Sequence, residues 1–165
     1  MYTMLGIIIG AYVSGHHDPR IVLGSGFAGV IALGISGSAS AYYTEKAERE
    51  RGLKKLESSM LTDLRGTLHD ESQSFASFMT AFVNGFSPIL AAIVMAAPFL
   101  LSMRGIMVVE DAFLLSIVIG LTEIFSLGYY LGYISRGNSI FYGLRMLFVA
   151  AITGVSGTII GMAFG

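Results

Sequence analysis

Four long apolar stretches constrain the fold of this sequence more than any other feature. They cover residues 21–44, 74–103, 107–134 and 139–164. At a rise of about 1.5 Å per residue, each forms a helix long enough to cross roughly 30 Å of hydrocarbon. A fifth and shorter stretch, residues 2–15, is expected to span a thinned bilayer, or to form half a helix or an interfacial piece. We therefore predict an all-α membrane protein, a five-helix transmembrane bundle in one membrane domain.

Composition supports the membrane assignment and excludes several other classes of function. Charged residues make up 13% of the 165, about half the share that is usual in soluble domains. The chain has no cysteine, which excludes a disulfide framework and a thiolate metal site. Its net charge of -1 argues against nucleic acid as a partner. Because neither a nucleophile–base pair nor a phosphate-binding loop is apparent, an enzyme is not expected.

The distribution of lysine and arginine predicts the orientation in the membrane. Six of these residues lie within residues 45–72, and Arg136 and Arg145 fall on the same predicted side. Only Arg20 and Arg104 fall on the other side. Cytoplasmic loops carry the excess of positive charge. The N-terminus and residues 45–72 are therefore expected in the cytoplasm, and the C-terminus outside.

Residues 45–72 read as a cytoplasmic amphipathic helical insert that extends the second span. Apolar residues recur at helical spacing and form one stripe: Leu53, Leu56, Met60, Leu64 and Leu68. Carboxylates on a different face and on the edge of this stripe are hard oxygen ligands, and they form a candidate cation-collecting surface. These metal-site candidates are Glu45, Glu48, Glu50 and Glu57. The alternative is a solvated helix with ordinary salt bridges.

The third apolar segment carries a stripe of polar residues along one helix face. Its members are Gln73, Ser77, Thr80, Asn84 and Ser87. Pro88 follows, and because proline has no N–H, the carbonyl of Asn84 loses its usual helical partner. Thr80 and Asn84 are therefore candidates for a polar transport path. The alternative is hydrogen bonding between helices, together with a kink.

Glu123 lies in the middle of the fourth apolar segment, within IGLTEIFSLGYY. A carboxylate at this depth costs about 2.5–3.5 kcal/mol on insertion scales and usually faces the bundle interior or water. Ser126 and Tyr130 share its side of the helix. Glu123 and Tyr130 are therefore further candidates for the path of a cation or a proton. The alternative is a neutral, hydrogen-bonded structural glutamate.

Two stripes of small residues predict close packing between helices. The second segment carries Gly24, Ala28, Ala32, Ser36 and Ser40, and the fifth carries Thr153, Gly157, Gly161 and Gly165. Because a bundle this small has few internal partners, one stripe is expected to serve a homodimer. The loop HHDPR at residues 16–20 offers His16, His17 and Asp18 as metal ligands or, alternatively, forms a polar turn.

The order of elements resembles the vacuolar iron transporter family. The resemblance covers nearly the whole chain and is carried by the DPR turn, by GSGFAGVIALGISGSASAYYTEKAERE, by FVNGFSPIL and by the basic turn within GYISRGNSIFYGLRMLF. It implies five transmembrane helices, a homodimer, and export of ferrous or manganous ions from the cytosol in exchange for protons. In that family the cation path runs between the subunits and is fed by a glutamate-rich cytoplasmic domain.

This chain resembles a divergent, short member of that family. At the end of the second helix, Ser36 and Tyr42 match the family pattern, but its methionine falls on Gly37 and its glutamate on Ala41. No membrane ligand transfers by motif, and the insert is shorter than the family's domain. We expect a divalent cation transporter with relocated ligands and no permanently bound cofactor. The alternative is a non-transporting membrane scaffold or subunit built on the same fold.

Overall fold

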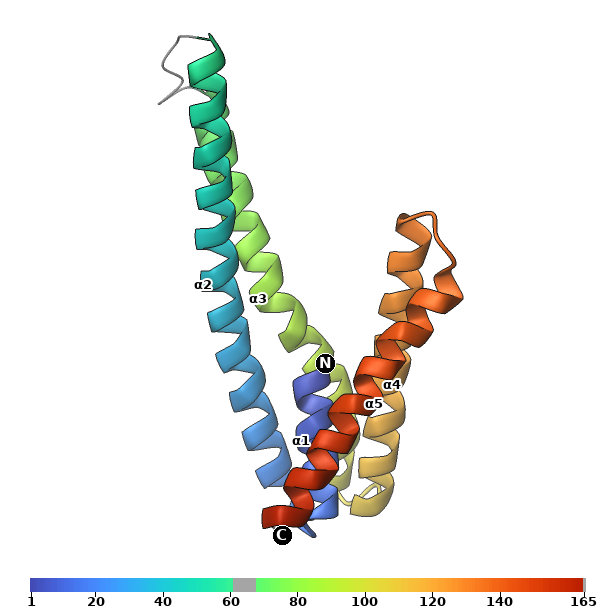
Figure 1. Ribbon diagram of the computed structural model, residues 1–165. Coiled ribbons are helices and arrows are strands. Elements are labelled where there is room, and N and C mark those ends of the chain that lie inside the picture. The colour runs from blue at the N-terminus through green and yellow to red at the C-terminus, as the bar shows by residue number, and fades with distance from the viewer. Residues whose placement is uncertain (61–67, 165) are drawn as a thin grey trace. The chain divides into compact units, whose positions relative to one another are not determined.

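The computed structural model describes the backbone of residues 1–60 and 68–164, and the side chains of residues 1–55 and 75–163. Throughout the described residues the chain is helical, with short turns between the helices (Figure 1). The helices are α1 (Tyr2–Val13), α2 (Pro19–Met60), α3 (Leu68–Met103), α4 (Val109–Ile134) and α5 (Ser139–Phe164). The prediction of an all-α chain is therefore confirmed for these residues.

Four of these helices are long and apolar enough to cross a membrane. The apolar spans are Pro19–Lys55, Phe75–Met103, Val109–Ile134 and Ser139–Ala163. Many large apolar side chains on them are exposed; Phe148, for example, has 69% of its surface accessible. A bilayer removes the cost of this exposure, because lipid tails are as apolar as the side chains. The chain is therefore a multi-pass membrane protein by the length and composition of its helices.

α1 differs from the other four helices in its length. Its 12 residues extend about 18 Å, which is less than the hydrocarbon thickness. Met4, Leu5 and Ile8 of α1 are at most 1% exposed. The first segment therefore forms a short helix whose buried side belongs to the protein core.

The described chain divides into two compact units, and each is described by itself. The first unit comprises residues 1–30 and 89–165. Its core draws side chains from all five helices: Met4, Leu5, Ile8, Val22, Leu23, Val30, Ala92, Met95, Ala96, Phe99, Ala112, Phe113, Ile124 and Ala150. A buried hydrogen bond of 2.8 Å from Ser116 Oγ to the carbonyl of Met95 links α4 to α3 inside this core.

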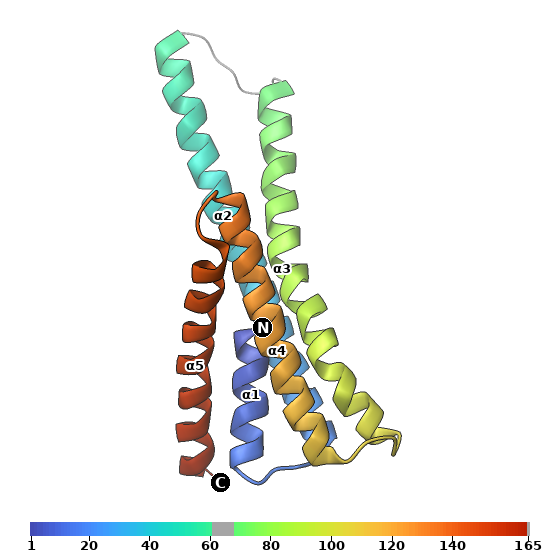
Figure 2. The same cartoon turned by 90° about the vertical axis from the view of Figure 1, so that its right-hand side faces the viewer.

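Glycines bring the helices of the first unit into backbone contact. α1 and α5 run side by side and in the same direction (Figure 2). A Cβ atom on Gly157 would lie 2.8 Å from the carbonyl oxygen of Gly6, and one on Gly161 would lie 2.7 Å from that of Gly10. The small-residue stripe predicted in the fifth segment is therefore an intramolecular contact at these two positions. Gly165 lies outside the described residues.

The stripe predicted in the second segment has a different outcome. All five of its members are exposed: Gly24, Ala28, Ala32, Ser36 and Ser40. Close packing of α2 within each unit uses other glycines. A Cβ on Gly26 would lie 2.4 Å from the sulfur of Met4 in the first unit, and one on Gly34 would lie 2.8 Å from the carbonyl oxygen of Gly85 in the second.

The second unit comprises residues 31–88, which include the later part of α2 and the earlier part of α3. α2 is continuous from Pro19 to Met60, so the charged residues that begin at Glu45 belong to the same helix as the apolar span. Leu53, the first residue of the predicted apolar stripe, is 7% exposed. The division from the first unit falls beside Pro88, inside α3.

Candidate functional site

Glu123 lies on α4 in the first unit, which contains the hydrophobic core. Its neighbour Ile124 is 1% exposed, whereas Glu123 itself is half-buried. The Oε2 atom of Glu123 is buried and has no hydrogen-bond partner among the described residues. One oxygen of this carboxylate is therefore left without a compensating donor among those residues.

The other polar side chains near Glu123 on α4 do not complete a ligand set. Thr122 donates its hydroxyl hydrogen bond to the carbonyl of Val118 at 2.8 Å, one turn back on the same helix. Ser126 is exposed, and Tyr130 is 59% exposed. Along this side of α4, Glu123 is therefore half-buried, whereas Ser126 and Tyr130 are exposed.

Thr80 and Asn84 lie on α3 in the second unit, and both are exposed. Thr80 donates a hydrogen bond of 3.0 Å to the carbonyl of Ala76, which satisfies its hydroxyl within the helix. Asn84 lies next to Gly85, the residue whose backbone α2 approaches closely. A path shared by these residues and Glu123 stays a prediction, because Glu123 belongs to the first unit.

The predicted metal-collecting glutamates lie on the later part of α2. Glu45 forms an ion pair with Arg49 one turn later, so its carboxylate already has a cationic partner. Glu48 and Glu50 are exposed. Glu57 lies outside the residues whose side chains the structure describes. In the part of the chain that is described, no three histidine or acidic side chains gather closely enough to hold a metal ion.

The HHDPR loop has specific structural roles. Asp18 Oδ1 accepts a hydrogen bond of 2.9 Å from the backbone N–H of Arg20, which makes Asp18 the N-cap of α2, with Pro19 at the favoured first helical position. The ring of His17 packs edge-on against Tyr12 and Phe113, with centroid distances of 5.5 and 5.7 Å. These contacts correspond to the polar-turn alternative.

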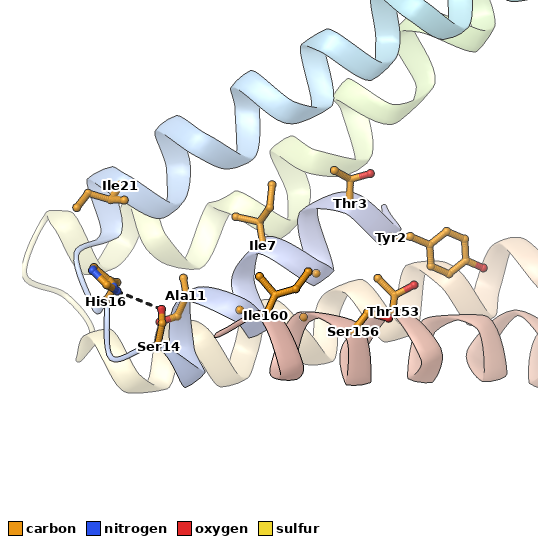
Figure 3. A pocket seen from close by; sticks show the side chains of 13 residues that line it. Tyr2, Thr3, Ile7, Ala11, Ser14, His16, Ile21, Thr153, Ser156 and Ile160 are labelled. Atoms are coloured by element: carbon orange, nitrogen blue, oxygen red, sulfur yellow. Dashed lines mark hydrogen bonds between the residues drawn. The ribbon is translucent and has the colours of Figure 1, made fainter. Parts of the chain in front are cut away.

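An apolar groove of about 490 Å³ runs along the first unit between α1 and α5 and ends at the start of α2 (Figure 3). Gly6, Gly10 and Gly157 open it, because they carry no side chains. Three of its hydroxyl groups are satisfied locally: Thr153 and Ser156 donate to carbonyls of α5, and Ser14 donates to the carbonyl of Ala11. No carboxylate lines this groove, so it does not have the chemistry of a cation site.

Arg145, which contributes to the predicted membrane orientation, has a specific environment in the structure. Its guanidinium lies 4.4 Å from the centre of the Phe141 ring. A second groove, of about 400 Å³, is lined by Arg145 and four apolar residues of α5. The spacing of four between Phe141 and Arg145 is the signal that would have revealed this contact, because residues four apart face each other on a helix.

The sequence is similar to that of an archaeal protein. No known protein family matches the sequence, and no solved structure matches it. The chain is 28% identical over 148 residues to uncharacterized protein MJ0645 of Methanocaldococcus jannaschii. The aligned region covers 88% of this chain and 74% of that protein. The name of this relative states no activity, so the resemblance to the vacuolar iron transporters stays a prediction.

Proposed function

We propose that this protein transports a divalent metal cation, iron or manganese, out of the cytosol in exchange for protons. The observation that carries the proposal is the buried Oε2 atom of Glu123, which has no hydrogen-bond partner among the described residues. Glu123 lies on α4, a helix long and apolar enough to span a membrane. An ionised carboxylate in that position is costly unless a cation or a proton compensates its charge. Alternate binding of a metal ion and a proton at one carboxylate is the basic requirement of a proton-coupled cation exchanger.

The chemistry of the candidate residues is consistent with iron(II) or manganese(II). Carboxylate, amide and hydroxyl oxygens are hard ligands that suit such ions, and the chain has no cysteine to select a softer metal. We assign Glu123 and Tyr130 on α4, and Thr80 and Asn84 on α3, to the membrane path. We assign Glu45, Glu48, Glu50 and Glu57 to the cytoplasmic mouth, where acidic side chains raise the local concentration of cations.

A second copy of the chain is part of this proposal. The exposed small-residue stripe of α2 allows two helices to approach closely, and Thr80, Asn84 and Tyr130 are exposed on the isolated chain. In a homodimer these polar side chains would line a path between the subunits, as the family resemblance implies. Replacing Ala32 by leucine would then separate the copies. Analytical ultracentrifugation in detergent measures this directly.

The test of transport is metal flux into proteoliposomes under a proton gradient. Glu123→Gln keeps the shape of the side chain and removes its charge. We expect this variant to lower iron(II) and manganese(II) flux at least tenfold, which corresponds to an increase of about 1.4 kcal/mol in the free energy of the rate-limiting barrier. Glu110→Gln is the matched control, because Glu110 is an exposed acid in the first turn of the same helix. Its flux should remain within about twofold of the parent protein.

Proton coupling is measured in the same vesicles with a trapped pH-sensitive dye. Metal movement in one direction should drive protons in the other, and Glu123→Gln should abolish both signals together. Equal flux in the parent protein and in Glu123→Gln would remove Glu123 from the mechanism. Absence of flux under every gradient would favour the second candidate, a non-transporting scaffold or subunit, which is also favoured by Gly37 and Ala41 at positions where the resemblance expects ligands.

A further inference from the structure

Arg145 is the only charged residue of α5, and its position in the helix is unusual. It is the seventh residue of the helix and is exposed. The remainder of the helix, through Phe164, contains no other charge. At about 1.5 Å per residue this uncharged remainder is close to the roughly 30 Å of hydrocarbon thickness. Arg145 therefore lies at the boundary between hydrocarbon and headgroups, on the side where the turn between α4 and α5 lies.

The guanidinium of Arg145 is directed toward that membrane surface. Its carbon lies 4.4 Å from the centre of the Phe141 ring, and Phe141 is one turn nearer the start of the helix. Helical side chains lean toward the N-terminus of their helix, and long cationic side chains near a span end extend toward the interface. The ring face holds the cation by a cation–π interaction. The charge is thus presented at the depth of lipid phosphates.

No carboxylate of this region compensates the positive charge. The sequence contains no aspartate or glutamate after Glu123, whereas it contains both Arg136 and Arg145. Arg136 lies in the turn before α5 and is exposed. This end of the α4–α5 pair is therefore a cationic surface without an anionic partner of its own.

Apolar side chains continue from Arg145 into the membrane. The groove of about 400 Å³ is lined by Phe141, Leu144, Arg145, Phe148 and Val149. Its apolar members are all well exposed, between 47% and 69%. Phe148 and Val149 follow Arg145 along the helix and so lie deeper in the hydrocarbon. The groove thus combines a cation at headgroup depth with an apolar wall at acyl-chain depth.

We propose that this face of α5 binds an anionic phospholipid. The phosphate pairs with the guanidinium of Arg145, and one acyl chain lies along Phe148 and Val149. Charge complementarity selects the headgroup, because the site supplies positive charge and no carboxylate. The apolar wall favours a lipid over a free phosphate ion, because the ion has no acyl chain that could contact Phe148 and Val149. The proposal is independent of the transport function and requires only that α5 spans the membrane.

Native mass spectrometry of the purified full chain tests this proposal. The detergent-solubilised protein is mixed with equal amounts of phosphatidylglycerol and phosphatidylcholine, and retained lipid is counted per protein. The parent protein should retain phosphatidylglycerol preferentially. Arg145→Gln should lower that preference about fivefold, the effect of one basic residue at an anionic surface. Arg145→Lys should lower it less, because it keeps the charge and loses the planar guanidinium.

Three further variants separate the site from general charge effects. Arg104→Gln makes the same charge change at an exposed residue in the turn after α3 and should leave the preference unchanged. Arg136→Gln should have a smaller effect than Arg145→Gln, because Arg136 does not line the groove. Phe148→Ala should reduce retention of phosphatidylglycerol without any change of charge. It keeps the proposal testable if Arg145→Gln fails to fold.

Several outcomes would overturn the proposal. They are the absence of any headgroup preference in the parent protein, an equal loss in Arg104→Gln and Arg145→Gln, and displacement of the lipid by millimolar inorganic phosphate. A fourth is a change of oligomeric mass in Arg145→Gln with lipid retention unchanged. That result would assign Arg145 to a carboxylate of a second copy of the chain.

Discussion

At the residue scale, the outcome of each small side chain depends on which helix face carries it. Gly157 and Gly161 were recognisable from their spacing, and both lie against the backbone of α1. The equally regular stripe on α2 is exposed, and Gly26 and Gly34 make the close approaches instead. α2 is rich in small residues on more than one face, so spacing alone identifies a surface able to pack and leaves open which neighbour it meets.

Gly157→Ala is predicted to destabilise the first unit. The added methyl group would lie 2.8 Å from the carbonyl oxygen of Gly6, and because that atom is backbone, α1 and α5 must separate. Overpacking of this kind costs about 1–3 kcal/mol. Thermal unfolding in detergent should show a lower midpoint for this variant.

The matched control for this prediction is Gly37→Ala on α2. A Cβ at Gly37 would meet nothing within 4 Å, and alanine is preferred over glycine inside a helix by up to about 1 kcal/mol. Its midpoint should be unchanged or higher. Equal midpoints for the two variants would show that α1 and α5 do not touch at Gly157.

At the element scale, the start of α2 shows how polar residues define the first turn of a helix. Asp18, Pro19 and Arg20 are the cap and first two helical positions of α2. The sequence placed Asp18 in a turn, but it left open whether His16, His17 and Asp18 ligate a metal. The geometry favours the turn, because one carboxylate oxygen of Asp18 already accepts a hydrogen bond from the helix.

Asp18→Ala is predicted to destabilise the protein by about 1 kcal/mol, the usual cost of losing an N-cap. Asp18→Asn should cost much less, because the amide oxygen can accept the same hydrogen bond from the N–H of Arg20. Thermal unfolding in detergent measures both. If Asp18 were instead a metal ligand, the asparagine variant would lose metal-dependent stabilisation, whereas a cap shows the same stability with and without a chelator.

At the scale of the whole molecule, hydropathy predicted more of the fold than of the site. Apolar length alone located the four long helices, because a bilayer demands about 20 apolar residues per span. Glu123 was also recognisable, since a charge within such a span is rare. The contact between Arg145 and the ring of Phe141 follows from their spacing of four, but the significance of the Arg145 charge was not recognisable, because it depends on the depth of the residue in its helix. Whether Glu123 shares a path with Asn84 depends on contacts between distant segments, which local patterns do not encode.

The predicted orientation can be tested on the whole chain, because it contains no cysteine. Single cysteines at positions 54 and 137 should react with a membrane-impermeant maleimide only after the cells are opened, since the basic residues on that side are expected in the cytoplasm. Cysteines at positions 17 and 105 should react in intact cells. All four positions lie outside the uncharged parts of the helices, and Lys54, His17, Gly105 and Gly137 are exposed.

The reverse labelling pattern would invert the orientation and would place the glutamates of α2 outside, where they could not collect metal from the cytosol. Labelling of all four positions in intact cells would contradict a sealed multi-pass arrangement altogether.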